Sequence, residues 1–151
     1  MQKEAYVSVT DNVTLVTIPN IPCDTEFFEY VFENIAEFGI NIDMISITPP
    51  QSSIVNLSFT IDDEDLCKLL KFNAMLSDKH LKPVVSSNNR KIKIYDELMK
   101  DMPGVAAKVF KAVRNTGIDI RIVTTSEVEI TFLVTEACSD KAVNAIKEAI
   151  L

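Results

Sequence analysis

The chain has 151 residues, a length that fits one ordinary domain or two small ones. With 47% hydrophobic residues it can bury a sizeable core, and its formal net charge of −7 argues against nucleic acid or an anionic membrane as a partner. The one basic run, residues 88–93, is typical of a solvated strand edge.

Three cysteines, Cys23, Cys67 and Cys138, lie far apart in the sequence, with no CxxC spacing and a single histidine. A zinc site needs about four clustered ligands, so we expect neither a metal nor a cofactor. The odd cysteine count and the lack of an evident signal peptide predict a reducing, cytoplasmic setting. No apolar run approaches the ~20 residues of a membrane-spanning helix.

Alternating and helical patterns of apolar residues divide the first part of the chain into elements. Asp11 and Asn12 are a turn signal between two strands, and Asp24 or Thr25 is placed to cap the first helix. Gly39 follows that helix, where a left-handed cap belongs. In chain order the predicted elements are strands 6–9 and 13–18, loop 19–25, helix 26–38, strands 40–48 and 54–61, helix 62–76 and strand 82–87.

The second part repeats this order. Gly104 lets the loop backbone bend at the start of the next helix, and Gly117 ends that helix. The apolar residues on one face of this helix are Val105, Val109, Phe110 and Val113. The predicted elements are strand 90–95, loop 96–104, helix 105–116, strand 118–127 running into a loop, strand 128–136 and helix 139–151.

The segments AEFGINIDMIS and VRNTGIDIRIV show the same helix–glycine–strand device 78 positions apart, which indicates an internal duplication. The first half has the ferredoxin-like order β-α-β-β-α-β, whereas the second lacks its last strand. The extra N-terminal strand can complete it, since an unfilled sheet edge promotes aggregation. We therefore predict an α+β fold of two ferredoxin-like units, residues 11–88 and residues 89–151 with 1–10.

The segment MPGVAAKVFKAVRNTGIDIRIVTTSEVEITFLV resembles the second ACT repeat of the aspartokinase regulatory region, and VTIPNIPCDTEFFEYVFENIAEFGINIDMIS resembles the first. In this family an extra strand before the first repeat packs with the second. Aspartokinases also carry an N-terminal kinase domain that opens with a glycine-rich phosphate segment. Nothing in this chain resembles it, so the resemblance implies a regulatory module and not an enzyme.

An amino-acid effector needs donors for its carboxylate and acceptors for its ammonium. Backbone N–H groups at the starts of the two first helices, in loops 20–26 and 100–106, supply the donors. Acceptors can come from Asp24, Asp43, Asp101, Asp119 and Glu127. The resemblance implies that effectors lie where such a loop meets the second strand of another repeat. The candidate ligand-binding residues are Asn20, Cys23, Asp24, Thr25, Thr48, Asp101, Pro103, Gly104, Asp119, Ile120, Thr125, Ser126 and Glu127.

The first repeat departs from the family pattern. The customary aspartate falls on Cys23, Pro-Gly falls on Thr25 and Glu26, and the usual Gln-Asn falls on Ile47 and Thr48. Glu26 could itself occupy the anion site at the start of the helix. In the second repeat DELM replaces a usual Gly-Ala-Gly-Met segment. Any surviving site is therefore expected in the second repeat.

These patterns favour a dimeric regulatory module that senses lysine, threonine or a related amino acid, with an aspartokinase catalytic chain as a possible partner. A ligand-free scaffold is the alternative, because the first-repeat loop is altered. An RNA-binding protein shares the strand order but needs stacking aromatics on central strands, where this chain offers Phe59 and Phe132. A small enzyme on the same scaffold is a further alternative, because fold does not fix function.

Overall fold

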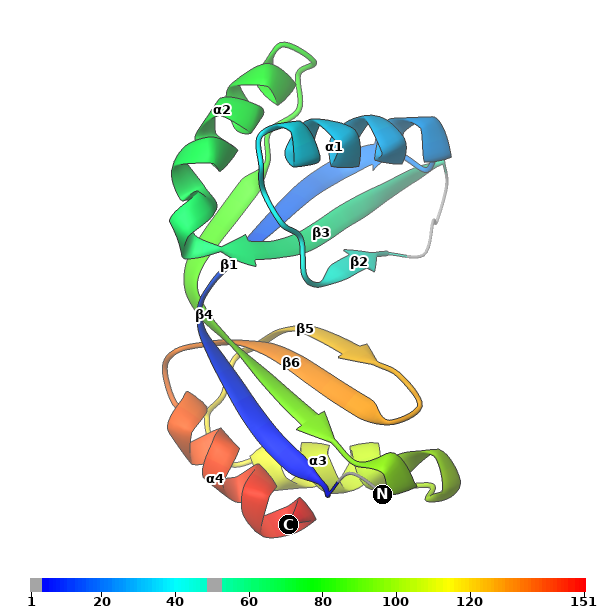
Figure 1. Cartoon of the computed structure of the whole chain (residues 1–151), viewed down its shortest axis with the longest axis vertical. Helices are drawn as coiled ribbons and strands as arrows, with labels where there is room; N and C mark the ends of the chain where they lie inside the picture. Colours follow the sequence, from blue (N-terminus) through cyan, green and yellow to red (C-terminus); the bar gives the residue numbers. More distant parts are fainter. Residues whose placement is uncertain (1–3, 49–52) are drawn as a thin grey trace. The chain divides into compact units, whose positions relative to one another are not determined.

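The computed structural model describes residues 4–48 and 53–151 (Figure 1). Strands and helices alternate along the chain as the duplicated pattern predicts. Two short 3₁₀ helices, η1 and η2, precede α2 and α3. The elements are β1 (Tyr6–Pro22), α1 (Thr25–Glu37), β2 (Ile45–Ile47), β3 (Ile54–Asp62), η1 (Asp63–Asp65), α2 (Leu66–Ser77), β4 (Val84–Tyr95), η2 (Glu97–Asp101), α3 (Val105–Val113), β5 (Ile120–Thr125), β6 (Glu129–Thr135) and α4 (Ser139–Ile150).

The strands follow the order β2-β3-β1-β4-β6-β5, and contacts divide the chain into two compact units. The first unit is Asn12–Ser87, and the second unit is the N-terminal segment through Asp11 together with Asn88–Leu151. The first therefore has the order β2-β3-β1-β4 and the second the order β1-β4-β6-β5. Both are ferredoxin-like units, as predicted, with two helices each.

Strands β1 and β4 each run without a break from one unit into the other, so two sequence predictions were wrong. No reversal occurs at Asp11 and Asn12, and segments 82–87 and 90–95 are not separate strands. Asn12 and Asn88 adopt left-handed conformations, with φ of 57° and 56°, at the residues where each strand changes unit. Asparagine tolerates this conformation, so the signal marked a local distortion of the strand and not a turn.

Four more predicted segments differ from the structure. The strand predicted at 40–48 is observed only as the shorter β2. Before regular pairing begins, the Asp43 N–H bonds to the Thr60 carbonyl and the Met44 N–H bonds to the Thr60 hydroxyl oxygen. Loop 19–25 is shorter, because β1 continues through a bulge to Pro22. Loop 96–104 contains η2, and helix 62–76 begins with η1.

Each unit has its own core between helices and sheet. In the first unit the buried residues alternate along β3 and recur at helical spacing on α1 and α2, where Leu69, Phe72 and Leu76 are fully buried. In the second unit, β4 and β6 supply Ile92, Ile94 and Phe132. Phe110 was predicted on the apolar face of α3 but is 45% exposed, although its ring meets the Phe132 ring edge-on at 5.3 Å.

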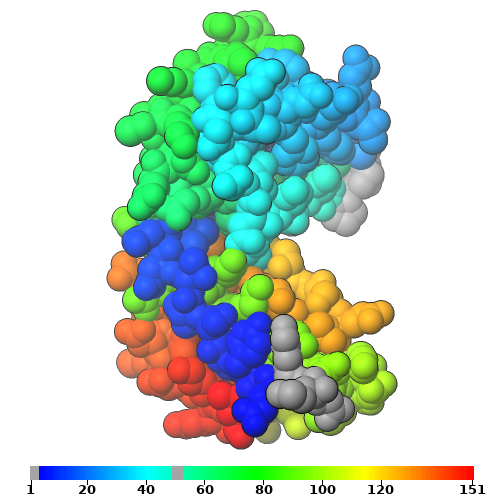
Figure 2. All heavy atoms as spheres, viewed as in Figure 1, coloured from blue at the N-terminus to red at the C-terminus, as the bar shows by residue number. Residues whose placement is uncertain are grey.

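The helix caps follow the predicted chemistry. The Asp24 carboxylate accepts a hydrogen bond from the N–H of Glu26 at the start of α1. Gly117 is left-handed as predicted, with φ of 76°, but α3 ends earlier than predicted, at Val113 with Arg114 as its C-cap residue. The outer sides of α1 and α2 lie at the surface of the first unit (Figure 2). In the described ranges, no helix combines the length and apolar character that a bilayer crossing needs.

The N-terminal strand completes the sheet of the second unit, as predicted. The rings of Tyr6 and Tyr95 stack with centroids 5.0 Å apart, and Val7 packs against the second core. The Arg90 guanidinium of β4 contacts Asp11 at 2.5 Å and Asp140 of α4 at 2.6 Å. Tyr6 lies against Tyr95 and Asp11 against Arg90, so β1 and β4 run in opposite directions. The hydrogen bond to Asp140, with further support from Asp11, raises the pKa of Arg90.

Replacing Arg90 with Ala should lower the free energy of unfolding of the second unit by about 1–2 kcal/mol, because two charge-assisted contacts are lost. The loss stays modest because Asp11 and Asp140 are 56% and 89% exposed and water can solvate them. Urea denaturation followed by hydrogen exchange in each unit measures it. Arg121→Ala, which removes one exposed ion pair with Asp119, is the control and should cost less than about 1 kcal/mol.

Candidate functional site

The first-repeat candidates gather at one end of the sheet of the first unit. Asn20 has a left-handed backbone (φ 56°) at the bulge in β1, and its N–H bonds to the side-chain oxygen of Asn56 at 3.0 Å. Thr48, just after β2, accepts a hydrogen bond from the Asn56 N–H at 2.9 Å. Asn56 on β3 therefore joins the ends of β1 and β2.

Asn56 was not among the site residues predicted from the sequence. The alternation of IVNLSFTI places it on the sheet face opposite the core residues Val55 and Leu57, which was the available signal. Its role as a bridge depends on the strand order β2-β3-β1, which local patterns do not give.

The N–H groups around the start of α1 have partners within the chain. Cys23 N–H bonds to the Ser53 carbonyl at 2.8 Å, and Glu26 N–H bonds to Asp24 at 3.1 Å. Thr25 is the first residue of α1 and is exposed. With Glu26 also in the first turn, two carboxylates already occupy this positive helix end. The first-unit residues are brought together, but their polar groups are largely satisfied.

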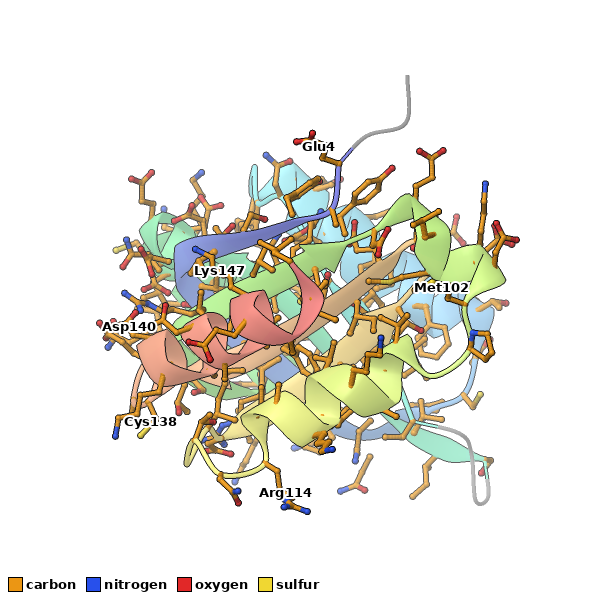
Figure 3. The ribbon with its side chains drawn as sticks, turned by 90° about the horizontal axis from the view of Figure 1, so that it is seen from below. Glu4, Met102, Arg114, Cys138, Asp140 and Lys147 are labelled. Atoms are coloured by element: carbon orange, nitrogen blue, oxygen red, sulfur yellow. The ribbon has the colours of Figure 1, made fainter. Side chains whose placement is uncertain are left out.

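The second-repeat candidates form two separate groups. Asp101 ends η2, and Pro103 and Gly104 lead into α3, with Met102 of this loop and Arg114 at opposite ends of that helix (Figure 3). The N–H of Asp96, just before η2, bonds to the Val128 carbonyl at 3.0 Å. This bond joins the start of the loop to the turn between β5 and β6.

Thr125, Ser126 and Glu127 lie at that same end of the sheet. The turn is held by the Ser126 N–H, which bonds to the Glu129 carbonyl at 2.9 Å, and all three residues are exposed. Asp101, Gly104 and the turn therefore share one end of the second unit.

Asp119 and Ile120 lie at the opposite end of β5. This strand has 6 residues, and an extended strand rises about 3.3 Å per residue, so its ends are roughly 20 Å apart. The Asp119 carboxylate contacts Arg121 at 2.9 Å, and its carbonyl accepts from the Thr135 N–H. One amino acid cannot touch both Asp119 and Glu127 of the same chain.

Gly104 gives the start of α3 a different character from that of α1. Its left-handed backbone (φ 96°) caps the helix without a side chain, and no side chain of the described residues caps it instead. The first turn of α3 carries no acidic residue, so its N–H groups can receive an anion. With Glu127 at the same end, the arrangement can hold a carboxylate and an ammonium group.

Residues 92–150 match the model of the ACT domain family. The Bacillus sp. (strain MGA3) aspartokinase is 30% identical over 153 residues, and the Geobacillus stearothermophilus aspartokinase 32% over 145. Each alignment covers 95% of this chain but 35% of the relative, so the chain spans about a third of the length of these relatives.

Solved structures match the whole fold. The regulatory subunit of aspartate kinase from Thermus thermophilus, in its ligand-free form, has a TM-score of 0.86 and 26% identity, with 96% of this chain and 97% of that chain covered. The regulatory subunit from Thermus flavus also gives 0.86, at 25% identity, with 99% and 100% covered.

In sequence and fold, the chain is similar to ACT-domain regulatory proteins of the aspartokinase type. Its 151 residues correspond to the regulatory part of these proteins and not to the kinase part, because regulatory subunits are covered almost completely and full-length relatives only in part. Within the described residues, no cluster of three or more His, Cys, Asp or Glu side chains could hold a metal ion.

Proposed function

We propose that the chain binds a free amino acid at the second unit and passes this signal to an aspartokinase catalytic chain. The observation that carries the proposal is the start of α3 at Gly104, which no side chain of the described residues caps and which shares one end of the sheet with Ser126 and Glu127. The helix N–H groups would take the effector carboxylate, and Glu127 its ammonium. The two repeats would be residues 11–88 and residues 89–151 with 1–10.

The first unit is the less suitable site. The N–H groups of Asn20, Cys23 and Glu26 already have acceptors in the chain, so an effector would have to displace them. Asp24 and Glu26 would also repel its carboxylate.

Asp119 and Glu127 are too far apart within one chain, but Asp119 of a second copy would lie near Glu127 of the first. Strand β5 is an edge of the sheet, and edge strands favour pairing with another chain. In an antiparallel pair, the start of one strand lies beside the end of its partner. A homodimer paired through β5 would thus place Asp119 and Ile120 of one copy near Thr125–Glu127 of the other.

The charges favour an effector with an uncharged side chain, such as threonine, over lysine. Lysine brings two ammonium groups, and the sequence offered Asp24, Asp119 and Glu127 to receive them. Asp24 caps α1 and Asp119 contacts Arg121, whereas Glu127 enters no ion pair among the described residues. Of these three carboxylates, Glu127 is therefore the one left for an effector, and it matches a single ammonium group.

Titration calorimetry against the amino acids tests the proposal. Glu127→Ala should weaken binding by about 1.5–3 kcal/mol, because a charged acceptor is removed. Glu129 is a poor control, since its carboxylate contacts Lys93 at 3.3 Å and accepts a hydrogen bond from the Thr131 hydroxyl at 3.0 Å. Glu148→Ala, on the exposed side of α4, should leave affinity unchanged.

If the parent protein binds none of the amino acids, the scaffold alternative replaces this proposal. RNA binding is disfavoured, because Phe59 and Phe132 are 0% and 1% exposed within the two cores and offer no stacking surface. The three free, exposed cysteines support a reducing, cytoplasmic location.

A further inference from the structure

The sheet of the first unit ends in a free edge at β4. In the order β2-β3-β1-β4, residues 84–87 of β4 form the last strand of this unit, with β1 on one side. The other side has no neighbouring strand among the residues that the structure describes. A free edge presents unpaired backbone N–H and C=O groups, which a further strand can pair with.

Helix α2 runs beside this edge (Figure 1). The Leu81 N–H, shortly before β4, bonds to the Leu76 carbonyl at 3.1 Å, so the end of α2 lies close to the start of the strand. At the other end, the Thr14 hydroxyl contacts Asp63 at 2.5 Å and Ser87 at 3.4 Å. The start of the helical segment and the end of the edge are therefore also close, and the two run in opposite directions.

Leu70 lies on the side of α2 that faces away from α1. Lys68 marks the opposite side, because its Nζ donates a hydrogen bond to the Gly39 carbonyl at 3.2 Å, just after α1. Lys79 marks it too, since its Nζ lies 4.1 Å from the centre of the Tyr30 ring of α1. At about 100° per residue, Leu70 is half a turn of the helix away from both lysines. Its side chain is 65% exposed.

The edge strand adds two exposed apolar side chains next to Leu70. Alternation along β4 places Val85 on the same face as Ser87, which is the face covered by α2, and Val84 on the other face. Val84 and Val85 are 62% and 37% exposed. No other large apolar side chain of the described first unit is as exposed as Leu70 and Val84. We call Leu70, Val84 and Val85 the α2–β4 strip.

The cations of the first unit all lie around the α2–β4 strip. This unit has 4 Lys or Arg against 11 Asp or Glu. The four are Lys68, Lys71, Lys79 and Lys82. Lys68 pairs with Asp65, but Lys71 and Lys82 are exposed and enter no ion pair among the described residues. An otherwise acidic unit therefore carries two available positive charges beside its free edge.

We propose that this edge binds an extended segment of another protein in which apolar side chains alternate with polar ones and carboxylates stand at the ends. The backbone of that segment pairs with residues 84–87, and its apolar side chains cover the α2–β4 strip. Its carboxylates meet Lys71 and Lys82 in charge-assisted contacts. The binding is independent of an amino-acid effector and of a dimer paired through β5.

Charge selects this occupant over two others. A second copy that offered the same edge would bring Lys71 and Lys82 against the same two lysines, and like charges repel. The corresponding edge of the second unit, residues 6–9 of β1, also has exposed apolar side chains. The charged residues that flank it in the described chain, Glu4 and Asp11, are acidic, so an acidic segment should prefer the β4 edge.

Fluorescence anisotropy of the full chain with a labelled synthetic peptide tests the proposal. In the probe peptide, valine alternates with threonine and two glutamates stand at each end. Binding should weaken about tenfold or more when lysines replace these glutamates, and also in 1 M salt, where charges are screened beyond about 3 Å. Leu70→Ser, and K71E with K82E, should each weaken binding by a similar factor. The control K108E with K111E on α3 changes the net charge as much as K71E with K82E does and should leave affinity unchanged.

Amide NMR of the isotope-labelled chain locates the bound peptide. Shift changes should gather in residues 66–87 and be absent from residues 6–9, the matched edge of the second unit. Circular dichroism verifies that each variant is folded, and Val84→Thr, which keeps a strand-forming residue, gives a milder second test with about threefold weaker binding.

Three results would overturn the proposal. The first is a probe peptide that does not bind or that binds no better than its lysine version. The second is a set of shift changes centred on α3 or on residues 6–9, which would mean that charge or edge pairing alone attracts the peptide. The third is a dimer of the chain that Leu70→Ser dissociates in sedimentation velocity, because a second copy would then be the occupant of this edge.

Discussion

Removing residues 1–10 should destabilise the second unit far more than the first. The deletion takes away the part of β1 that borders β4, the ring contact of Tyr6 with Tyr95, and Val7 from the second core. Each strand hydrogen bond contributes about 0.5–1.5 kcal/mol and a stacked ring pair a similar amount. The total loss should be on the order of 5 kcal/mol, enough to unfold a marginal unit.

Hydrogen exchange resolved by peptide is the measurement. Protection should fall in residues 88–151 and be largely retained in residues 13–87. Glu4→Ala, which changes an exposed residue of the same segment, should leave hydrogen-exchange protection in both ranges unchanged. The interlocked architecture is contradicted if the deletion removes more protection from residues 13–87.

The duplicated fold could be predicted because its signals are local. Apolar spacing marks α1 and α3, and a glycine after each helix marks the entry to the next strand. The missing last strand of the second unit was predicted from the strand count alone. What failed was the continuity of β1 and β4, because left-handed Asn12 and Asn88 give the same sequence signal whether the chain reverses or continues.

The residue types of the candidate site could be predicted from the sequence, but not which of those residues lie close together. Periodicity and resemblance select Gly104, Asp119 and Glu127 as candidate residues. Which of them share an end of the sheet depends on strand direction, and β5 separates Asp119 from Glu127 by its whole length. Side-chain contacts such as Asn56 with Asn20 and Asp119 with Arg121 arise only from the folded chain.

Phe132→Ala should cost the second unit about 3–5 kcal/mol, the usual range for a buried phenylalanine. Phe132 is 1% exposed on β6, among the core residues between sheet and helices. The substitution leaves a cavity and removes the edge-on contact with Phe110, which is half exposed and cannot fill the space alone. Hydrogen exchange and denaturant unfolding together give the loss in each unit.

Phe59→Ala is the matched variant in the first unit. Phe59 is 0% exposed on β3 and meets the Phe32 ring edge-on at 6.4 Å, so its loss is similar in size. If the two cores are independent, each variant lowers protection mainly in its own unit. Because β1 and β4 belong to both sheets, a smaller part of each loss should reach the other unit through those strands. Equal losses in both units from either variant would instead mean that the two cores unfold as one.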